Sequence, residues 1–214
     1  MESVDGKMKD ISALLVAATV WAYWIRVGVM SYRLRRRTRR LAGVVPQQRL
    51  EQGMWLVWVP LVALWMGLPL LAALRDNAPW AVPSFAQEAP VLWLRWLAAG
   101  AAVVCLALTL RCWSRMGAAW TMAVTPDRKT ELITDGPFAR VRHPIYGYSL
   151  MLMACSVVVV ATLPMLVVGL VHLGLMIVKA RNEERHLLAV HGAAYARYVE
   201  RTGRFMPRLA APRE

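Results

Sequence analysis

A chain of 214 residues that is 58% hydrophobic and has 10 tryptophans has the composition of a membrane protein. Its 26 Lys and Arg outnumber its 13 Asp and Glu, and the basic residues lie in blocks between apolar runs of bilayer length. This pattern indicates membrane topology and argues against a protein that binds nucleic acid.

Three apolar segments in the N-terminal half are long enough to cross a bilayer as helices, namely 11–30, 53–74 and 90–110. The first is expected to be retained, because residues 1–10 are mixed in charge and no small-residue cleavage site follows. Arg26 and Arg95 lie near the ends of their spans, and their side chains are expected to extend to the membrane interface.

The longest apolar run covers 145–178 and would be about 51 Å long as a single helix at about 1.5 Å per residue. A bilayer core is only about 30 Å thick, so the run must fold back on itself. Thr162-Leu163-Pro164 lies near its middle, where the proline favours a break between two helices. The predicted fold class is an all-α membrane protein with about five transmembrane helices, the last two a tight helical hairpin, followed by a helical tail.

The distribution of basic residues predicts the orientation of the chain. Segments 31–52 and 111–144 and the tail from Lys179 together hold 21 of the 26 Lys and Arg. Because basic loops stay in the cytoplasm, these segments and the C-terminus are predicted to be cytoplasmic. Arginine outnumbers lysine by 22 to four and Ala, Val and Trp are frequent, which points to a GC-rich bacterial source and a bacterial inner membrane.

A hairpin would bring two polar clusters to the same membrane edge. Arg142 and His143 precede its first arm, and Lys179, Glu183 and Glu184 lie at the end of its second arm. Lys179 and Glu183 are four residues apart and share a helix face, whereas Glu184 is rotated from Glu183 by about 100°. These side chains either form a functional site or serve only as interface anchors and surface ion pairs.

The C-terminal half contains a set of motifs in a fixed order. They are MGAAW at 116–120, LITDGPFARVRHPIYGY at 132–148, ARNEERHLL at 180–188 and HGAAYARYVERTGRFMP at 191–207. With this set the chain resembles the isoprenylcysteine carboxyl methyltransferase and phospholipid methyltransferase group of integral-membrane enzymes. The first two spans match the group only as generic membrane helices. The expected organisation is a single integral-membrane domain over 1–214, with three spans in 11–110 and a cofactor-binding half over 111–214 that comprises the hairpin 145–180 and the tail 181–214.

The resemblance implies transfer of a methyl group from S-adenosylmethionine to a lipophilic or lipid-anchored acceptor among the membrane lipids. It implies cofactor-binding roles for Thr130, Leu132, Ile133, Phe138, His143, Tyr146 and Glu183, and catalytic roles for Arg142, Lys179 and Glu184. The sequence has no glycine-rich dinucleotide-binding motif after a strand, so the cofactor must be held in another way. Lys179 stands where the family tends to have an arginine, which leaves the acceptor, and whether O, N or S is methylated, open.

The implied roles have chemical reasons. A carboxylate at Glu183 would accept hydrogen bonds from both ribose hydroxyls. Arg142 and His143 would meet the carboxylate of the cofactor. Phe138 and Tyr146 would pack on the adenine or the sulfonium, because a cation favours an aromatic face.

Two other classes of protein stay open. Sterol and steroid reductases share a similar C-terminal arrangement and bind NADPH, but their motif usually has asparagine and an acidic residue where this chain has Ile145 and Tyr148. A non-enzymatic transporter or scaffold would show polar residues deep in several spans, and these are missing from the sequence. The three cysteines lack metal-ligand spacing, and no metal site is predicted.

Overall fold

The computed structural model describes residues 10–38, 45–75, 80–124 and 132–208, and the regular secondary structure within these ranges is helical. The long helices are α1 (Ile11–Thr38), α2 (Arg49–Leu74), α3 (Ala89–Met116), α4 (Pro144–Val160) and α5 (Leu163–His191), followed by the short α6 (Ala193–Arg201). Three short 3-10 helices complete the set: η1 (Ser84–Gln87), η2 (Gly117–Ala119) and η3 (Gly136–Ala139). The described ranges contain no β-strand, only an isolated bridge between Val141 and Gly203.

Four helices are long and apolar enough to cross a membrane: Ile11–Arg37, Arg49–Leu74, Ala89–Ala119 and Leu163–His191. The chain is therefore a multi-pass integral membrane protein, and the all-α fold class is confirmed for the described residues. Helix α4 is equally apolar but has only 17 residues. The fifth span, which α4 would supply, stays a prediction.

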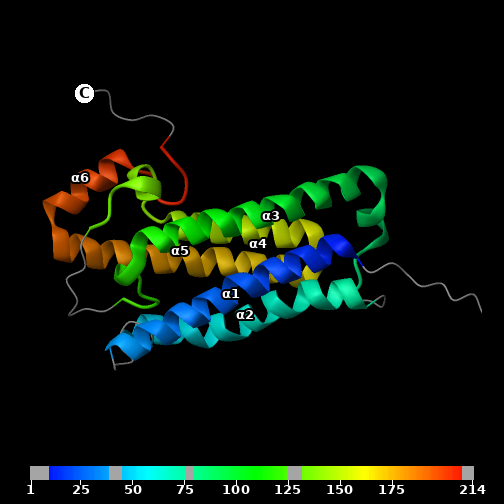
Figure 1. Ribbon diagram of the computed structural model, residues 1–214, viewed down its shortest axis with the longest axis horizontal. Helices are drawn as coiled ribbons and strands as arrows, with labels where there is room; N and C mark the ends of the chain where they lie inside the picture. The colour runs from blue at the N-terminus through cyan, green and yellow to red at the C-terminus, as the bar shows by residue number, and fades with distance from the viewer. Residues whose placement is uncertain (1–9, 39–44, 76–79, 125–131, 209–214) are drawn as a thin grey trace, which may run out of the picture.

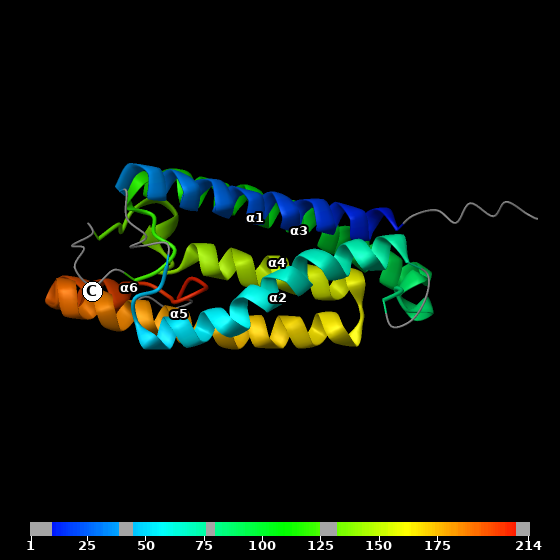
Figure 2. The same ribbon diagram turned by 90° about the horizontal axis from the view of Figure 1, so that it is seen from below.

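The apolar run from 145 to 178 folds back on itself in the structure. Helix α4 ends at Val160, and Ala161 takes a left-handed conformation with φ of 51° while its N–H donates to the Val157 carbonyl over 2.8 Å. Helix α5 begins at Leu163 with Pro164 in its first turn, where proline costs no hydrogen bond. Helices α4 and α5 then lie side by side (Figure 2). Helix α5 differs from the expected hairpin boundary at 180, because it continues without a break to His191.

The five long helices run along one axis, with α6 and the described C-terminal segment at one end and the start of α1 at the other (Figure 1). Helix α1 packs on α2, α3 and α4, and α2 also packs on α5. Trp65 of α2 is fully buried among them, where its indole N–H donates to Ser156 Oγ of α4 over 3.0 Å. Its ring also packs on His172 of α5, with centroids 5.0 Å apart, so this one side chain joins three helices.

Arg95 of α3 does not extend to the membrane interface, so that expectation was wrong. The residue is 1% exposed, and its guanidinium forms an ion pair with Asp10. Its Nε donates to the Val159 carbonyl of α4 over 2.8 Å, and Nη1 donates to the Ala86 carbonyl over 3.5 Å. Arg95 thus satisfies a backbone acceptor in the last turn of α4, where helix carbonyls lack intrahelical donors.

The segment after α6 returns to the start of α4 and pairs with the chain there. The N–H groups of Arg142 and His143 donate to the carbonyls of Gly203 and Arg204 over 2.8 and 2.9 Å. Gly147, in the first turns of α4, lets the segment approach closely, because a Cβ at this position would lie 2.5 Å from the Phe205 carbonyl oxygen. We call residues 202–206 the return segment.

Replacing Gly147 with alanine is expected to push the return segment away from α4, because the obstructing atom belongs to the backbone. The free energy of unfolding is expected to fall by about 1–3 kcal/mol, the usual range for overpacked sites. Thermal unfolding of the purified protein in detergent measures this loss. Gly174→Ala on α5 is the matched control, since a Cβ there has no neighbour within 4 Å. A Gly147→Ala protein as stable as Gly174→Ala would contradict the close approach.

Candidate functional site

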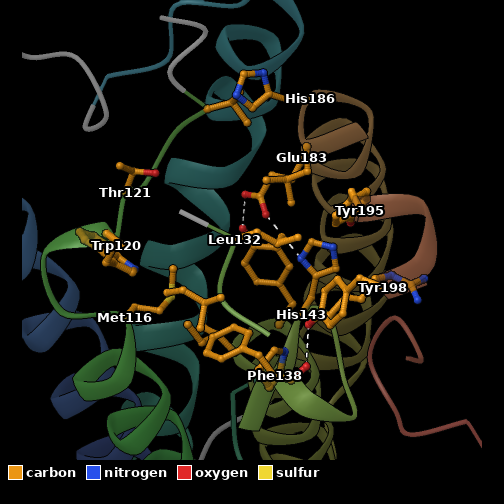
Figure 3. A pocket seen from close by; sticks show the side chains of 18 residues that line it. Met116, Trp120, Thr121, Leu132, Phe138, His143, Glu183, His186, Tyr195 and Tyr198 are labelled. Carbon is orange, nitrogen blue, oxygen red and sulfur yellow. Dashed lines mark hydrogen bonds and ion pairs between the residues drawn. The ribbon is translucent and has the colours of Figure 1, made fainter. Parts of the chain in front are cut away.

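A pocket lies at the end of the bundle where α3 ends, α4 begins and α5 meets α6. Its walls come from 116–124, from 132–146, from α5 and from α6. Figure 3 shows His143 and Glu183 pointing toward each other inside it, with Trp120 on one side and Tyr195 and Tyr198 on the other. The cavity volume is about 190 Å³. Sites for drug-sized ligands start at roughly 300 Å³, so a ligand of that size would also fill the mouth of the pocket.

The fold-back brings the two predicted polar clusters together at this end of the bundle, with His143 and Glu183 inside the pocket. His143, the residue before α4, places Nδ1 3.5 Å from Glu183 Oε2 of α5. The Tyr146 hydroxyl donates a hydrogen bond to Glu183 Oε1. The rings of His143 and Tyr146 are stacked, with centroids 5.3 Å apart and planes within 5°. The start of α4 therefore presents an aromatic surface beside a carboxylate.

Glu184 points in another direction from Glu183, as the 100° rotation predicts. Arg142 Nε donates to Glu184 Oε1 over 3.0 Å, and Arg204 Nη2 of the return segment donates to Oε2 over 2.7 Å. His143 Nε2 lies 3.4 Å from Glu184 Oε1. Glu184 does not line the pocket, but it joins the start of α4, the end of α5 and the return segment.

Arg142 lines the pocket, yet its guanidinium is bound to protein groups. Besides Glu184, its Nη1 donates to the carbonyls of Val199, over 3.2 Å, and Thr202. These two carbonyls belong to the last turn of α6 and the residue that follows. In this structure Arg142 therefore closes the C-terminal end of α6.

Lys179 is buried beside the pocket and does not line it. Its Nζ lies 3.4 Å from Glu183 Oε1, 3.4 Å from Glu51 Oε1 and 3.0 Å from the Met122 carbonyl. Glu51, in the first turn of α2, is 2% exposed and also accepts the Val124 N–H over 3.1 Å. Nothing in the sequence singled out Glu51, because an acidic residue in the first turn of a helix is common.

The remaining predicted cofactor residues lie in the segment 130–138, before α4. Leu132, Ile133 and Phe138 line the pocket, whereas Thr130 lies outside the described residues. Phe138 is fixed by the Tyr198 hydroxyl, which donates to its carbonyl over 2.6 Å. Tyr198 and Tyr195 were present in a recognised motif but were not predicted to line the site. Burial raises the pKa of Tyr198 to about 12, so this phenol stays protonated and remains a donor.

The electrostatics of the site centre on His143. Burial by itself favours the neutral imidazole, but the nearby carboxylates of Glu183 and Glu184 outweigh it and raise the pKa of His143. A protonated His143 would place a positive charge between two negative ones at the start of α4. Among the described residues no group of His, Cys, Asp and Glu could hold a metal ion.

Residues 98–189 match the family of isoprenylcysteine carboxyl methyltransferases (ICMT). Over this segment, which is less than half of the chain, the protein is similar to that family. The ICMT segment runs from within α3 through α4 and most of α5, so it holds the start of α4 and both glutamates. A search of curated proteins found no match to the chain. The family match thus confirms the resemblance seen in the sequence over these residues.

Replacing Glu184 with glutamine is expected to destabilise the protein by about 1.5–3 kcal/mol, the usual range for hydrogen bonds to charged groups. The reason is that Arg142 and Arg204 would lose a shared carboxylate. Thermal unfolding in detergent gives the measurement. Glu200→Gln, an exposed change on α6, is the control and should leave the unfolding temperature unchanged. Equal unfolding temperatures for the two variants would show that the Glu184 ion pairs contribute no stability.

The raised pKa of His143 predicts a pH dependence of stability. The contribution of the protonated imidazole is fully present below its unfolded pKa of about 6.5 and is lost as pH rises through the higher folded value. The unfolding temperature should therefore fall as pH rises above about 6.5, and it should fall less steeply in His143→Gln than in the unchanged protein. His186→Gln, which changes another histidine of the pocket, should keep the slope of the unchanged protein. If the slope of His143→Gln equals the slopes of the unchanged protein and of His186→Gln, His143 is not the group that causes the pH dependence.

Proposed function

We propose that the protein transfers a methyl group from S-adenosylmethionine to a lipophilic acceptor, and that the pocket at the start of α4 binds the cofactor. The observation that carries this proposal is the placement of the Glu183 carboxylate beside the stacked rings of His143 and Tyr146, inside the segment that matches the family. A carboxylate and aromatic faces are what a ribose and a sulfonium require.

The described residues fit the polar groups of S-adenosylmethionine. Glu183 Oε1 already meets the Tyr146 hydroxyl and Lys179 Nζ, and Oε2 meets His143 Nδ1. A carboxylate has about four acceptor positions, so one position on Oε2 is left for a ribose hydroxyl. His143, when protonated, can pair with the carboxylate of the amino-acid part. The first turn of α4 adds N–H groups without intrahelical acceptors, since Pro144 opens the helix.

The apolar groups of the cofactor would meet the other pocket walls. Phe138, Leu132 and Ile133 offer apolar surface for the adenine, and Tyr146 offers an aromatic face for the sulfonium. Thr130, in the same stretch of sequence, is proposed to contribute main-chain groups.

The chemistry asks mainly for alignment and exclusion of water. When bound, S-adenosylmethionine supplies a methyl group that is already activated by its sulfonium, so positioning provides most of the rate enhancement. Of the residues predicted to be catalytic, Arg142 and Glu184 are proposed to act through His143 by holding it in place. Lys179 is proposed to face the acceptor side, because it is bound to Glu183 from outside the pocket.

The location of the pocket suits a membrane-associated acceptor. It lies where the spans α3 and α5 end, so a polar cofactor can arrive from water and an apolar acceptor from the bilayer. We propose that this end faces the cytoplasm. The segments 31–52 and 111–144, which connect the spans, are rich in Lys and Arg, and basic loops stay in the cytoplasm.

Replacing Glu183 with glutamine is expected to weaken binding of S-adenosylhomocysteine by about 1–3 kcal/mol, because a charged acceptor for the ribose is lost. Calorimetric titration of the detergent-purified protein measures this. Tyr148→Phe is the control, since Tyr148 packs against the core and does not line the pocket.

Two outcomes would contradict the proposal. Unchanged affinity in Glu183→Gln would remove this residue from the cofactor site. Binding of NADPH in place of S-adenosylhomocysteine by the unchanged protein would assign it to the reductases.

A further inference from the structure

A narrow crevice between α2 and α5 lies next to the pocket, and Lys179 stands between the two. Glu183 lines the pocket, Lys179 lines the crevice, and their charged atoms are 3.4 Å apart. Apart from Lys179 and Glu51, the crevice is lined by apolar residues: Met54, Trp55, Trp58, Leu175 and Met176. Both helices are long and apolar enough to span a membrane.

The charges at the inner end of the crevice are already paired. Three oxygen atoms, from Glu51, Glu183 and the Met122 carbonyl, lie within 3.4 Å of Lys179 Nζ, which has three N–H bonds to offer. Lys179 is the one cation among the described residues that line the crevice. A ligand carboxylate that reached this point would find no unused donor on Lys179 and would meet the Glu51 carboxylate.

Glu51 is held firmly in this position. It accepts the Val124 N–H over 3.1 Å, which ties it to the chain that forms the pocket wall. One turn earlier, Gln48 Oε1 accepts a hydrogen bond from Asn182 of α5 over 2.7 Å. The start of α2 is therefore fixed to α5 at two points, and the Glu51 side chain is held at the inner end of the crevice.

We propose that this crevice admits the acceptor, and that Glu51 selects a lipophilic molecule with a non-anionic head group over the carboxylate to which the family's name refers. The inference rests on the proposed function and narrows its acceptor class. An alcohol or thiol can donate a hydrogen bond to Glu51, and an amine adds complementary charge. The crevice has a cavity volume of about 10 Å³, so entry requires its side chains to shift, which the flexible Met54 favours.

The test uses three photoreactive probes with the same diazirine-bearing alkyl chain, ended by a hydroxyl, an amine or a carboxylate. The full chain is reconstituted in phosphatidylcholine vesicles, and labelled peptides are mapped by mass spectrometry. We expect the alcohol and the amine to label peptides containing Trp55 and Leu175, and the carboxylate to label them about tenfold less. Equal labelling by all three probes, or no labelling of these peptides, would overturn the proposal.

A substitution at Glu51 tests the selectivity directly. Glu51→Gln keeps an oxygen for the Val124 N–H and removes the charge, so labelling by the carboxylate probe should rise about tenfold. Glu88→Gln, an exposed change before α3, is the matched control and should keep the wild-type ratio. If Glu51→Gln does not change the ratio of carboxylate labelling to alcohol labelling, Glu51 has no role in the selection. If the variant does not fold, the wild-type ratio alone decides.

The two proposals fail in different ways. Labelling needs no cofactor, so it reports on the crevice even if the protein is not a methyltransferase. Titration of the same sample with S-adenosylhomocysteine reports on the pocket. Binding without the predicted labelling ratio rejects the acceptor class, and the predicted ratio without binding rejects the methyltransferase function.

Discussion

Two adjacent carboxylates on α5 hold the pocket end of the protein together. Glu183 binds the start of α4 through His143 and Tyr146, while Glu184 binds Arg142 and the return segment through Arg204. Because neighbouring helical residues point about 100° apart, one carboxylate can face the pocket while the other fastens its outer shell. If both contacts were lost, the start of α4, which carries the aromatic rings of the pocket, would have neither of these two charged partners on α5.

The N-terminal half contributes more than membrane anchoring. Glu51 reaches Lys179 and the backbone of Val124 from the first turn of α2, so a helix outside the matched family segment sets the charge next to the pocket. At the far end of the bundle, Arg95 ties α3 to the last turn of α4 and to Asp10. Helix α4, the shortest of the long helices, is thus fastened at both ends by charged groups from other elements.

Features that depend on short stretches of the sequence could be predicted. Apolar runs of bilayer length gave the spans, and a proline near the middle of the last run gave the fold-back and hence the approach of His143 to Glu183. Features that depend on a distant partner could not. Arg95 was expected at the membrane interface because its partners, Asp10 and the Val159 carbonyl, lie far from it in the sequence. Only the fold brings them together. Glu51 was overlooked for the same reason, since its partner Lys179 is far along the chain.

The return segment also sets the limits of the unit that can work as a site. Residues 98–189 match the family, yet Tyr195, Tyr198 and Arg204 lie beyond them and Glu51 lies before them. These residues supply one wall of the pocket, the clamp on Glu184 and the partner of Lys179. The segment that matches the family therefore encloses the pocket only in part, and the complete enclosure reaches from α2 to the end of the return segment.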